Sequence, residues 1–215
     1  MSKLTFEISM SLDGFIAGPN ADLENPLGVG GERLHEWVVG LRSWRESHGH
    51  SGGEESADSE LLEESLRRTG AVVMGRRMFS GGEGSWEDDP KADGWWGDEP
   101  PFGVPVFVLT HHPRDAVSKQ GGTTYTFVAD GIEAALEQAR AAAGDGDVSI
   151  AGGASVAQQY LRAGLVDEIQ LHLVPVLLGD GVRLFGDRGA QSIELESTRV
   201  IESPAVTHLS YRPIA

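Results

Sequence analysis

The sequence predicts an α/β protein with a mostly parallel β-sheet and an antiparallel C-terminal edge. Two observations lead to this prediction. Through the first two thirds of the chain, short apolar runs alternate with stretches of helical periodicity, whereas the last third contains strand-like runs in succession. Strands that alternate with helices favour parallel pairing, and consecutive strands favour antiparallel pairing. With no internal repeat and no linker, residues 1–215 are expected to form a single domain.

Each expected element has its own local signal. A helix near 31–46 carries Leu34, Trp37, Val38 and Leu41 on one face, so Trp37 is expected in the core. A second helix near 59–68 has acidic residues early and arginines late, as the helix dipole favours. The polar, glycine-rich stretch between them, 47–58, predicts a mobile loop. Further helices are expected near 131–143 and 154–163, and strands near 3–10, 71–74, 105–109, 123–128, 148–151, 166–174, 192–200 and 205–212.

Composition narrows the classes of function. The chain of 215 residues is long enough for one sizeable core, and it has no cysteine, which excludes disulfides, thiolate catalysis and cysteine-ligated metals. A formal net charge of −16 disfavours nucleic acid and anionic membranes as partners. No apolar run approaches the roughly 20 residues that cross a bilayer, and the N-terminus lacks a signal sequence, so a cytoplasmic location is expected.

A glycine pair marks a candidate anion site. The apolar run 148–151 ends at Gly152 and Gly153, where the helix near 154–163 should begin. Free backbone N–H groups at such a helix start attract anions, and the missing Cβ atoms let a phosphate approach the backbone. A tight turn explains the same pair equally well when it is considered alone.

Two other predicted strands end in comparable residues. The run at 71–74 is followed by Gly75, Arg76 and Arg77, and the run at 105–109 by Thr110 and His111, with Arg114 close behind. Nucleotide sites lie at the carboxyl edge of such sheets, so a small-molecule ligand is expected there.

Other candidate sites have simpler explanations. His48 and His50 beside Glu54 have metal-ligand chemistry, but a solvated glycine-serine loop explains them better. No nucleophile-elbow or P-loop motif is present. Trp86, Trp95 and Trp96 lie in a predicted loop, where they would either cover a ligand or contact a partner subunit, and the sequence does not separate the two.

Five motifs occur in the order found in one known family. They are Ser-Leu-Asp-Gly-Phe-Ile-Ala-Gly at 11–18, Val-Met-Gly-Arg at 73–76, Val-Phe-Val-Leu-Thr at 106–110, Ala-Gly-Gly-Ala-Ser at 151–155 and Val-Pro-Val-Leu-Leu-Gly-Asp-Gly-Val-Arg-Leu-Phe at 174–185. With them, the chain resembles the dihydrofolate-reductase-like superfamily, specifically the reductase domain of the bifunctional deaminase-reductase of riboflavin biosynthesis and its stand-alone relatives. Insertions at about 21–60 and 80–103 depart from the shorter members.

The resemblance implies a three-layer α/β/α dihydrofolate-reductase-like fold and an NADPH-dependent reductase acting on a small heterocyclic substrate. The archetype is the ribosylaminopyrimidine reductase of riboflavin biosynthesis. Because the chain carries no deaminase domain, that substrate is left open, and Arg183 is a candidate contact for a substrate phosphate. The cofactor-binding residues implied are Ala17, Gly75, Arg76, Arg77, Thr110, His111, Arg114, Gly152, Gly153, Ala154, Ser155 and Val156.

Two residues receive individual roles. Arg76 follows the strand end where the superfamily places a cation against the 2′-phosphate of NADPH, although a capping or surface role is the alternative. Asp13 is the candidate catalytic residue, with an Asx-type turn as an equally good structural explanation. The sequence supplies no clear proton donor: Glu32, His35 and Glu36 are near the expected first helix, but the insertion obscures their alignment.

The sequence leaves two functions other than a reductase open, and it predicts a homodimer. The same strand ends would also suit a dinucleotide- or antifolate-binding protein without turnover, whereas a purely structural protein would leave them without a ligand. The family resemblance implies a homodimer. The mixed second face of strand 166–174, with Glu168, Gln170, His172 and Val174, suggests subunit contact near the late strands.

Overall fold

The chain divides into two compact units. A computed structural model describes residues 2–82, 84–186 and 192–214. Unit 1 comprises residues 1–6 and 69–166, and unit 2 comprises residues 7–68 and 167–215. Strand β1, Leu4–Ser11, contributes its first residues to unit 1 and the remainder to unit 2. Among the described residues, no helix combines the length and apolar character needed to cross a membrane.

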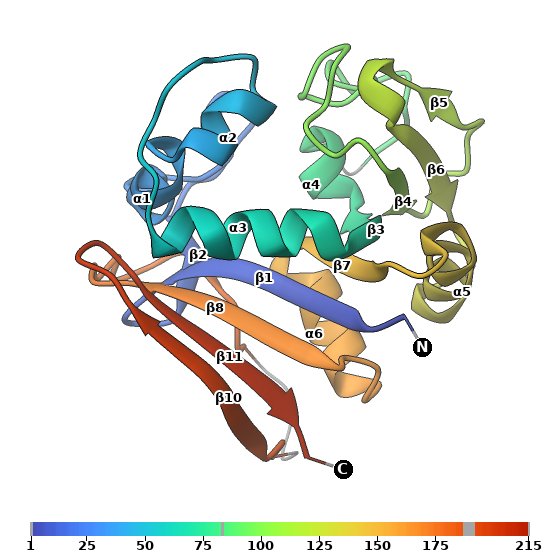
Figure 1. Cartoon of the computed structure of the whole chain (residues 1–215). Helices are drawn as coiled ribbons and strands as arrows, with labels where there is room; N and C mark the ends of the chain where they lie inside the picture. The colour runs from blue at the N-terminus through green and yellow to red at the C-terminus, as the bar shows by residue number, and fades with distance from the viewer. Residues whose placement is uncertain (1, 83, 187–191, 215) are drawn as a thin grey trace. The chain divides into compact units, whose positions relative to one another are not determined.

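Unit 1 contains the parallel part of the fold (Figure 1). Its strands follow the order β1-β7-β3-β4-β6-β5, and every neighbouring pair is parallel except β5 with β6. The alternation of strand and helix in the sequence favours this pairing, because a parallel neighbour is reached only through a crossover. The elements are β3 Thr69–Gly75, α4 Arg76–Ser80, β4 Pro105–Leu109, β5 Val117–Ser118, η2 Gln120–Gly122, β6 Thr124–Val128, α5 Ile132–Ala143, β7 Asp147–Gly152 and α6 Ala154–Arg162.

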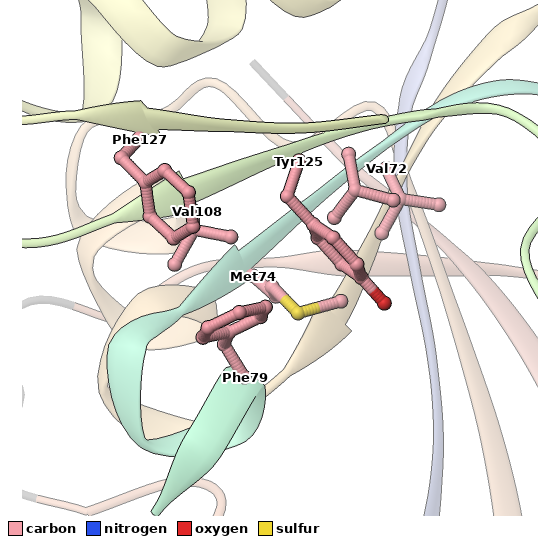
Figure 2. Packing of buried hydrophobic residues seen from close by; sticks show 7 residues of the cluster. Val72, Met74, Phe79, Val108, Tyr125 and Phe127 are labelled. Carbon is pink, nitrogen blue, oxygen red and sulfur yellow. The ribbon is translucent and has the colours of Figure 1, made fainter. Parts of the chain in front are cut away.

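The core of unit 1 follows the two-residue period of its strands. Alternate residues of β3, β4 and β6 form one buried cluster, and Phe79 of α4 packs into it edge-to-face against Tyr125 and Phe127 (Figure 2). Helix α5 packs against β3, β4 and β7. The buried cluster consists of Val72, Met74, Phe79, Val106, Val108, Tyr125 and Phe127.

Unit 2 contains the antiparallel part. Its main strands follow the order β1-β8-β11-β10, and the pairs β8–β11 and β11–β10 are antiparallel. A small second sheet pairs β2 with β9. The elements are β2 Phe15–Ala17, η1 Gly31–Leu34, α1 Glu36–Val39, α2 Arg42–Ser47, α3 Ala57–Arg68, β8 Glu168–Val174, β9 Val182–Arg183, β10 Leu195–Glu202 and β11 Thr207–Pro213. The predicted mixed α/β class, with parallel strands first and antiparallel strands last, is confirmed.

The single helix predicted near 31–46 is wrong. The segment forms three short helices, η1, α1 and α2, and the chain is extended at Leu41. Leu41 forms a β-bridge with Glu54, and the N–H of Arg42 donates to the carbonyl of Glu54 at 3.0 Å. This bridge to a residue outside the helix competes with helical hydrogen bonding. The same contacts attach the segment 47–58, which was predicted as a mobile loop.

The second face of β8 is covered within unit 2, so it does not supply the subunit contact predicted from it. His172 and Val174 are buried, and Glu168 pairs with Arg68 of α3 at 3.3 Å. Val174 packs in a cluster with Leu34 of η1, onto which Trp37 also packs. The mixed character of this face reflects ion pairs and hydrogen bonds to helices of the same unit. Trp37 is in this core, as predicted.

Candidate functional site

Three strand ends of unit 1 lie side by side. Strands β7, β3 and β4 are neighbours and parallel, so their carboxyl ends meet at one edge of the sheet. Met74 pairs with Gly152, and Gly75 pairs with Leu109, the residue before Thr110. The structure therefore brings together the glycine and hydroxyl residues that the sequence predicted as a ligand site in this part of the chain.

The glycines at this edge allow a close backbone approach. A Cβ atom on Gly75 would lie 3.0 Å from Cγ2 of Val156 in α6, and Gly152 has a φ of +132°, which favours glycine. At Gly153, in contrast, a Cβ atom would meet no other atom within 4 Å. The backbone at Gly153 is thus open to an approaching group, which fits the predicted role.

Helix α6 begins at this open backbone. It has no side-chain N-cap, and the N–H groups of Val156 and Ala157 both donate to the carbonyl of Gly153, at 3.0 and 3.3 Å. The N–H groups of Ala154 and Ser155 precede the first intrahelical acceptor, as at every helix start. Together with the helix dipole they offer donors to an anion such as a pyrophosphate.

The Arg76 side chain is buried in an ion pair. Its Nη2 contacts the carboxylate of Asp89, its Nε donates to Ser80 Oγ at 3.0 Å, and Ser80 Oγ donates to Asp89 at 2.6 Å. Burial lowers the pKa of the Arg76 guanidinium, and the charge of Asp89 opposes that shift. Nη1 of Arg76 is also buried, and the described residues provide no hydrogen-bond acceptor for it.

Trp86 covers this ion pair. The Arg76 guanidinium carbon lies 3.2 Å from the centre of the Trp86 ring, and that of Arg114 lies 4.6 Å from it. Trp86 Nε1 donates to the carbonyl of His112 at 2.7 Å, and Arg114 Nη1 donates to the carbonyl of Ala92 at 2.7 Å. These contacts fasten the loop after α4 to the strand ends.

The tryptophans of this loop pack within unit 1 itself. Trp86 and Trp96 lie against the core cluster of unit 1, and Trp95 Nε1 donates to the carbonyl of Met78 at 2.7 Å. Covering a ligand and contacting a partner subunit were the two alternatives left open by the sequence. The structure provides a third explanation, which is that Trp86 and Trp96 extend the hydrophobic core.

The remaining predicted residues of this edge differ in exposure. Arg77 and His111 are exposed. Thr110 is buried, and its hydroxyl accepts the N–H of His112 at 3.0 Å. Arg114 is half-buried and already engaged with the loop.

Asp13, in unit 2, holds a turn together. Its Oδ1 accepts hydrogen bonds from Ser11 Oγ at 2.6 Å and from the N–H of Leu178 at 3.1 Å, and its Oδ2 accepts the N–H of Gly179 at 2.7 Å. The hydrogen bond from Ser11, with those from the two N–H groups, outweighs the effect of burial and lowers the pKa of Asp13 to about 2. A carboxyl group with this pKa is ionised at neutral pH and is poorly suited to donate a proton.

Ala17 and Arg183 also belong to unit 2. Ala17 pairs with Val182 of β9, and Arg183 Nη1 donates to the carbonyl of Asp13 at 3.1 Å. The Arg183 guanidinium also lies over the ring of Phe15, at 4.3 Å. Arg183 therefore helps to hold the Asp13 turn.

His48, which was considered as a metal ligand, has other contacts. His48 stacks on Trp44 with ring centres 4.1 Å apart, and its Nδ1 lies 2.8 Å from the carbonyl oxygen of Trp44. Within residues 2–82, 84–186 and 192–214, no three His, Cys, Asp or Glu side chains gather in a way that could hold a metal ion.

Sequence reasoning missed the acidic partner of Arg76. Asp89 lies 13 positions after Arg76, in a loop that contains several other acidic residues. Only its burial distinguishes it, and burial of a loop residue has no local sequence signal. The acidic and tryptophan-rich composition of this loop is the only available indication.

Comparison with known proteins identifies the family. The model of the RibD C-terminal domain matches residues 2–209. An uncharacterized protein, YyaP of Bacillus subtilis, is 33% identical over 211 residues, which cover 95% of this chain and 92% of that protein.

Solved structures agree with the fold. A putative riboflavin biosynthesis protein from Shewanella has a TM-score of 0.66 at 23% identity, with 100% of both chains covered. The Thermotoga maritima deaminase/reductase has a TM-score of 0.58 at 13% identity, covering 99% of this chain and 57% of that one. The riboflavin biosynthesis reductase Rib7 of Saccharomyces has a TM-score of 0.53 at 13% identity, covering 100% of this chain and 89% of that one. The chain belongs to the RibD C-terminal domain family.

Proposed function

We propose that this protein is an NADPH-dependent reductase that acts on a small heterocyclic substrate. The observation that carries the proposal is the edge where β7, β3 and β4 end, with Gly75, Gly152 and Gly153 beside the start of α6. Membership of the RibD C-terminal domain family supports a reductase, and the pyrimidine compounds named for the Thermotoga relative indicate the substrate class.

The residues of this edge suit a dinucleotide. A pyrophosphate would accept the N–H groups of Ala154 and Ser155, and the open backbone at Gly153 would allow it close. NADPH supplies the hydride when it is bound, and the chain has to hold and orient it.

Arg76 is proposed to bind the 2′-phosphate of NADPH. Its present contacts mean that the loop covering it has to move first. Asp89 already neutralises its charge, so Nη1 is the guanidinium nitrogen available to a phosphate oxygen. Because Trp86 covers the guanidinium, the loop that carries Trp86 has to move for this contact to form. Arg77, which is adjacent and exposed, is the proposed assisting cation.

Asp13 is proposed as a positioning residue and not as the proton donor. Its carboxylate accepts hydrogen bonds from the loop at Leu178 and Gly179, and its pKa of about 2 keeps it ionised at neutral pH. Its loss would therefore loosen that loop without removing an acid.

The decisive experiment combines a binding titration with turnover. NADPH binding and NADPH oxidation with ribosylaminopyrimidine substrates are measured for the wild type and for Gly153→Val. Since a Cβ atom at Gly153 would meet no atom within 4 Å, the variant should fold and should lose most of its NADPH affinity. Unchanged affinity in a folded Gly153→Val would place the pyrophosphate elsewhere. Binding without oxidation of any substrate would favour the binding-protein alternative.

We further propose a homodimer, with contact through the antiparallel strands of unit 2. Val200 of β10 is 60% exposed and pairs with Leu209 of β11, which pairs in turn with Leu171 of β8, so the three share one apolar face. Light scattering of the wild type should give the mass of a dimer, and Val200→Asp should shift it toward the monomer. A monomeric wild type at micromolar concentration contradicts this proposal.

A further inference from the structure

A chain of four titratable side chains crosses the interior of unit 2. Glu7 of β1 lies 2.9 Å from Nε2 of His172 in β8, and Nδ1 of His172 lies 2.6 Å from Nδ1 of His208 in β11. His208 Nε2 then lies 2.9 Å from Asp58 in α3. We call these four residues the tetrad.

The two histidines of the tetrad are buried within unit 2. The side chains of His172 and His208 are 3% and 2% exposed. Ser65 of α3 donates to Glu7, and Ser203, in the turn before β11, donates to Asp58.

The α1 region packs against the two histidines of the tetrad. The ring of Trp37 lies 4.7 Å from that of His172 and 5.1 Å from that of His208. His35, just before α1, interacts electrostatically with His172, and burial lowers the pKa of His35.

Two neutral imidazoles do not supply enough hydrogens for the hydrogen bonds of the tetrad. An ionised carboxylate only accepts hydrogen bonds, so Nε2 of each ring must carry a hydrogen. A neutral imidazole has one N–H, so two neutral rings would then face each other with two bare Nδ1 lone pairs at 2.6 Å. Turning either ring over would replace its two hydrogen bonds with C–H contacts, so the ring orientations are determined by their partners.

We propose that the tetrad holds one proton beyond those of two neutral imidazoles and two carboxylates. This proton bridges the two Nδ1 atoms and gives the tetrad a net charge of −1. A metal ion does not fit between the rings, because two bonds of about 2.0–2.1 Å at tetrahedral angles hold nitrogens more than about 3 Å apart.

Burial and neighbouring groups shift the pKa values of two members of the tetrad, Glu7 and His208. Burial raises the pKa of Glu7, but its hydrogen bond and charge interaction with His172 dominate and the net shift is downward. Burial also lowers the pKa of His208, and repulsion from His172 adds to this shift, although Asp58 opposes it. The lowered pKa of Glu7 agrees with an ionised carboxylate at this end of the tetrad.

The additional proton makes the stability of unit 2 depend on pH in both directions. Above the unfolded histidine pKa of about 6.5, the folded tetrad binds one more proton than the unfolded chain, so stability falls as pH rises. Below that pKa, His172 and His208 are both protonated in the unfolded chain. The folded tetrad then binds one proton fewer than the unfolded chain, so stability falls as pH falls. Each limb corresponds to about a tenfold change in the unfolding constant per pH unit.

Glu7→Gln isolates this proton. A glutamine of the same shape can accept from Ser65 with its oxygen and donate to His172 Nε2 with its amide. His172 then donates from Nδ1 to His208, and His208 from Nε2 to Asp58, so two neutral rings satisfy every contact. The folded variant should bind one proton fewer than the folded wild type at every pH between about 5.5 and 8.5.

The experiment compares urea unfolding of the wild-type chain and Glu7→Gln across that pH range. We expect the ratio of the unfolding constants, wild type over variant, to rise about tenfold for each pH unit. Contributions from His35 and the exposed groups cancel in the ratio. Glu63→Gln on the surface of α3 is the matched control, and its ratio should not vary with pH. A ratio independent of pH for Glu7→Gln overturns the proposal.

A second measurement needs no variant. Nitrogen-15 NMR of the wild type reports the protonation of each imidazole nitrogen, with the other five histidines as internal references. We expect three ring hydrogens in total for His172 and His208 at neutral pH. Two hydrogens, or four, would contradict the proposal even if Glu7→Gln failed to fold.

Discussion

The two units each bury a polar cluster beneath a tryptophan, and the clusters differ in chemistry. In unit 1, Trp86 covers the Arg76–Asp89 ion pair, and in unit 2, Trp37 covers the tetrad. A guanidinium group stays charged at every pH a protein tolerates, whereas an imidazole gains or loses its charge near pH 6.5. The first cluster should therefore hold its loop across the pH range in which histidines titrate, and the second should hold α3 only within a limited part of that range.

The largest effect should come from breaking the unit 1 pair. Asp89→Asn leaves the buried Arg76 charge without a counter-charge and should lower the free energy of unfolding by about 3–5 kcal/mol. Asp88→Asn, which changes an exposed neighbour, is the control and should have little effect. Equal effects from the two substitutions in urea unfolding would mean that Arg76 does not depend on Asp89.

The next effect concerns the cofactor. Replacing the pair with apolar residues, Arg76→Met with Asp89→Leu, avoids an unpaired buried charge and should preserve the fold. If Arg76 contacts the 2′-phosphate, NADPH affinity should fall by about 1.5–3 kcal/mol, roughly ten- to a hundredfold, whereas NADH affinity should not change. Arg77→Met is the comparison variant. A similar loss for both cofactors would assign Arg76 to the fold alone.

A smaller loss of stability is expected in unit 2 when the pH is lowered. Burial lowers the folded-state pKa of His35 and His208, so their stabilisation is present above the unfolded pKa of about 6.5 and is lost as pH falls. Hydrogen exchange should show α3 and β11 losing protection by about tenfold per pH unit for each proton taken up, relative to α4. Equal loss in α4 would remove the contrast between the two clusters.

The smallest effect is expected at Asp13. Asp13→Asn keeps most of the acceptor contacts of the turn, so kcat/KM should change by less than about tenfold. Loss of a general acid would cost about 10²–10⁴-fold and would move the acid limb of the pH–rate profile. Measuring that profile for both proteins distinguishes a positioning role from a catalytic one.

Much of the fold was predictable because its signals are local. The strand at 105–109 and the helix near 131–143 were located within about one residue, since their apolar periodicity reflects a burial pattern that the sheet then satisfies. The helix near 31–46 was not, because the bridge between Leu41 and Glu54 depends on a residue 13 positions away. The ribbon of β2 and β9 was missed for the same reason, since its strands are short and far apart in the sequence.

The candidate site likewise has residues that the sequence predicted and contacts that it did not. Gly75, Thr110 and Gly152 were predictable as strand ends, because a glycine or hydroxyl after an apolar run is visible in the sequence. The partners of Arg76 and Asp13 were not, because each pairs through a loop folded back onto it. The mixed polar and apolar face of β8 was visible in the sequence. Two of its polar residues pair with side chains of α3 and β11, and these partners were not predictable.

The sequence alone determined the main alternation of strands and helices, the α/β class and the glycine-bearing strand ends, because hydrophobic period and backbone freedom are properties of short segments. Only the tertiary structure decided which charged side chains are buried and what they face. The cost of burying a charge depends on its partners, and Asp89 for Arg76, or His208 for His172, comes from a distant part of the chain.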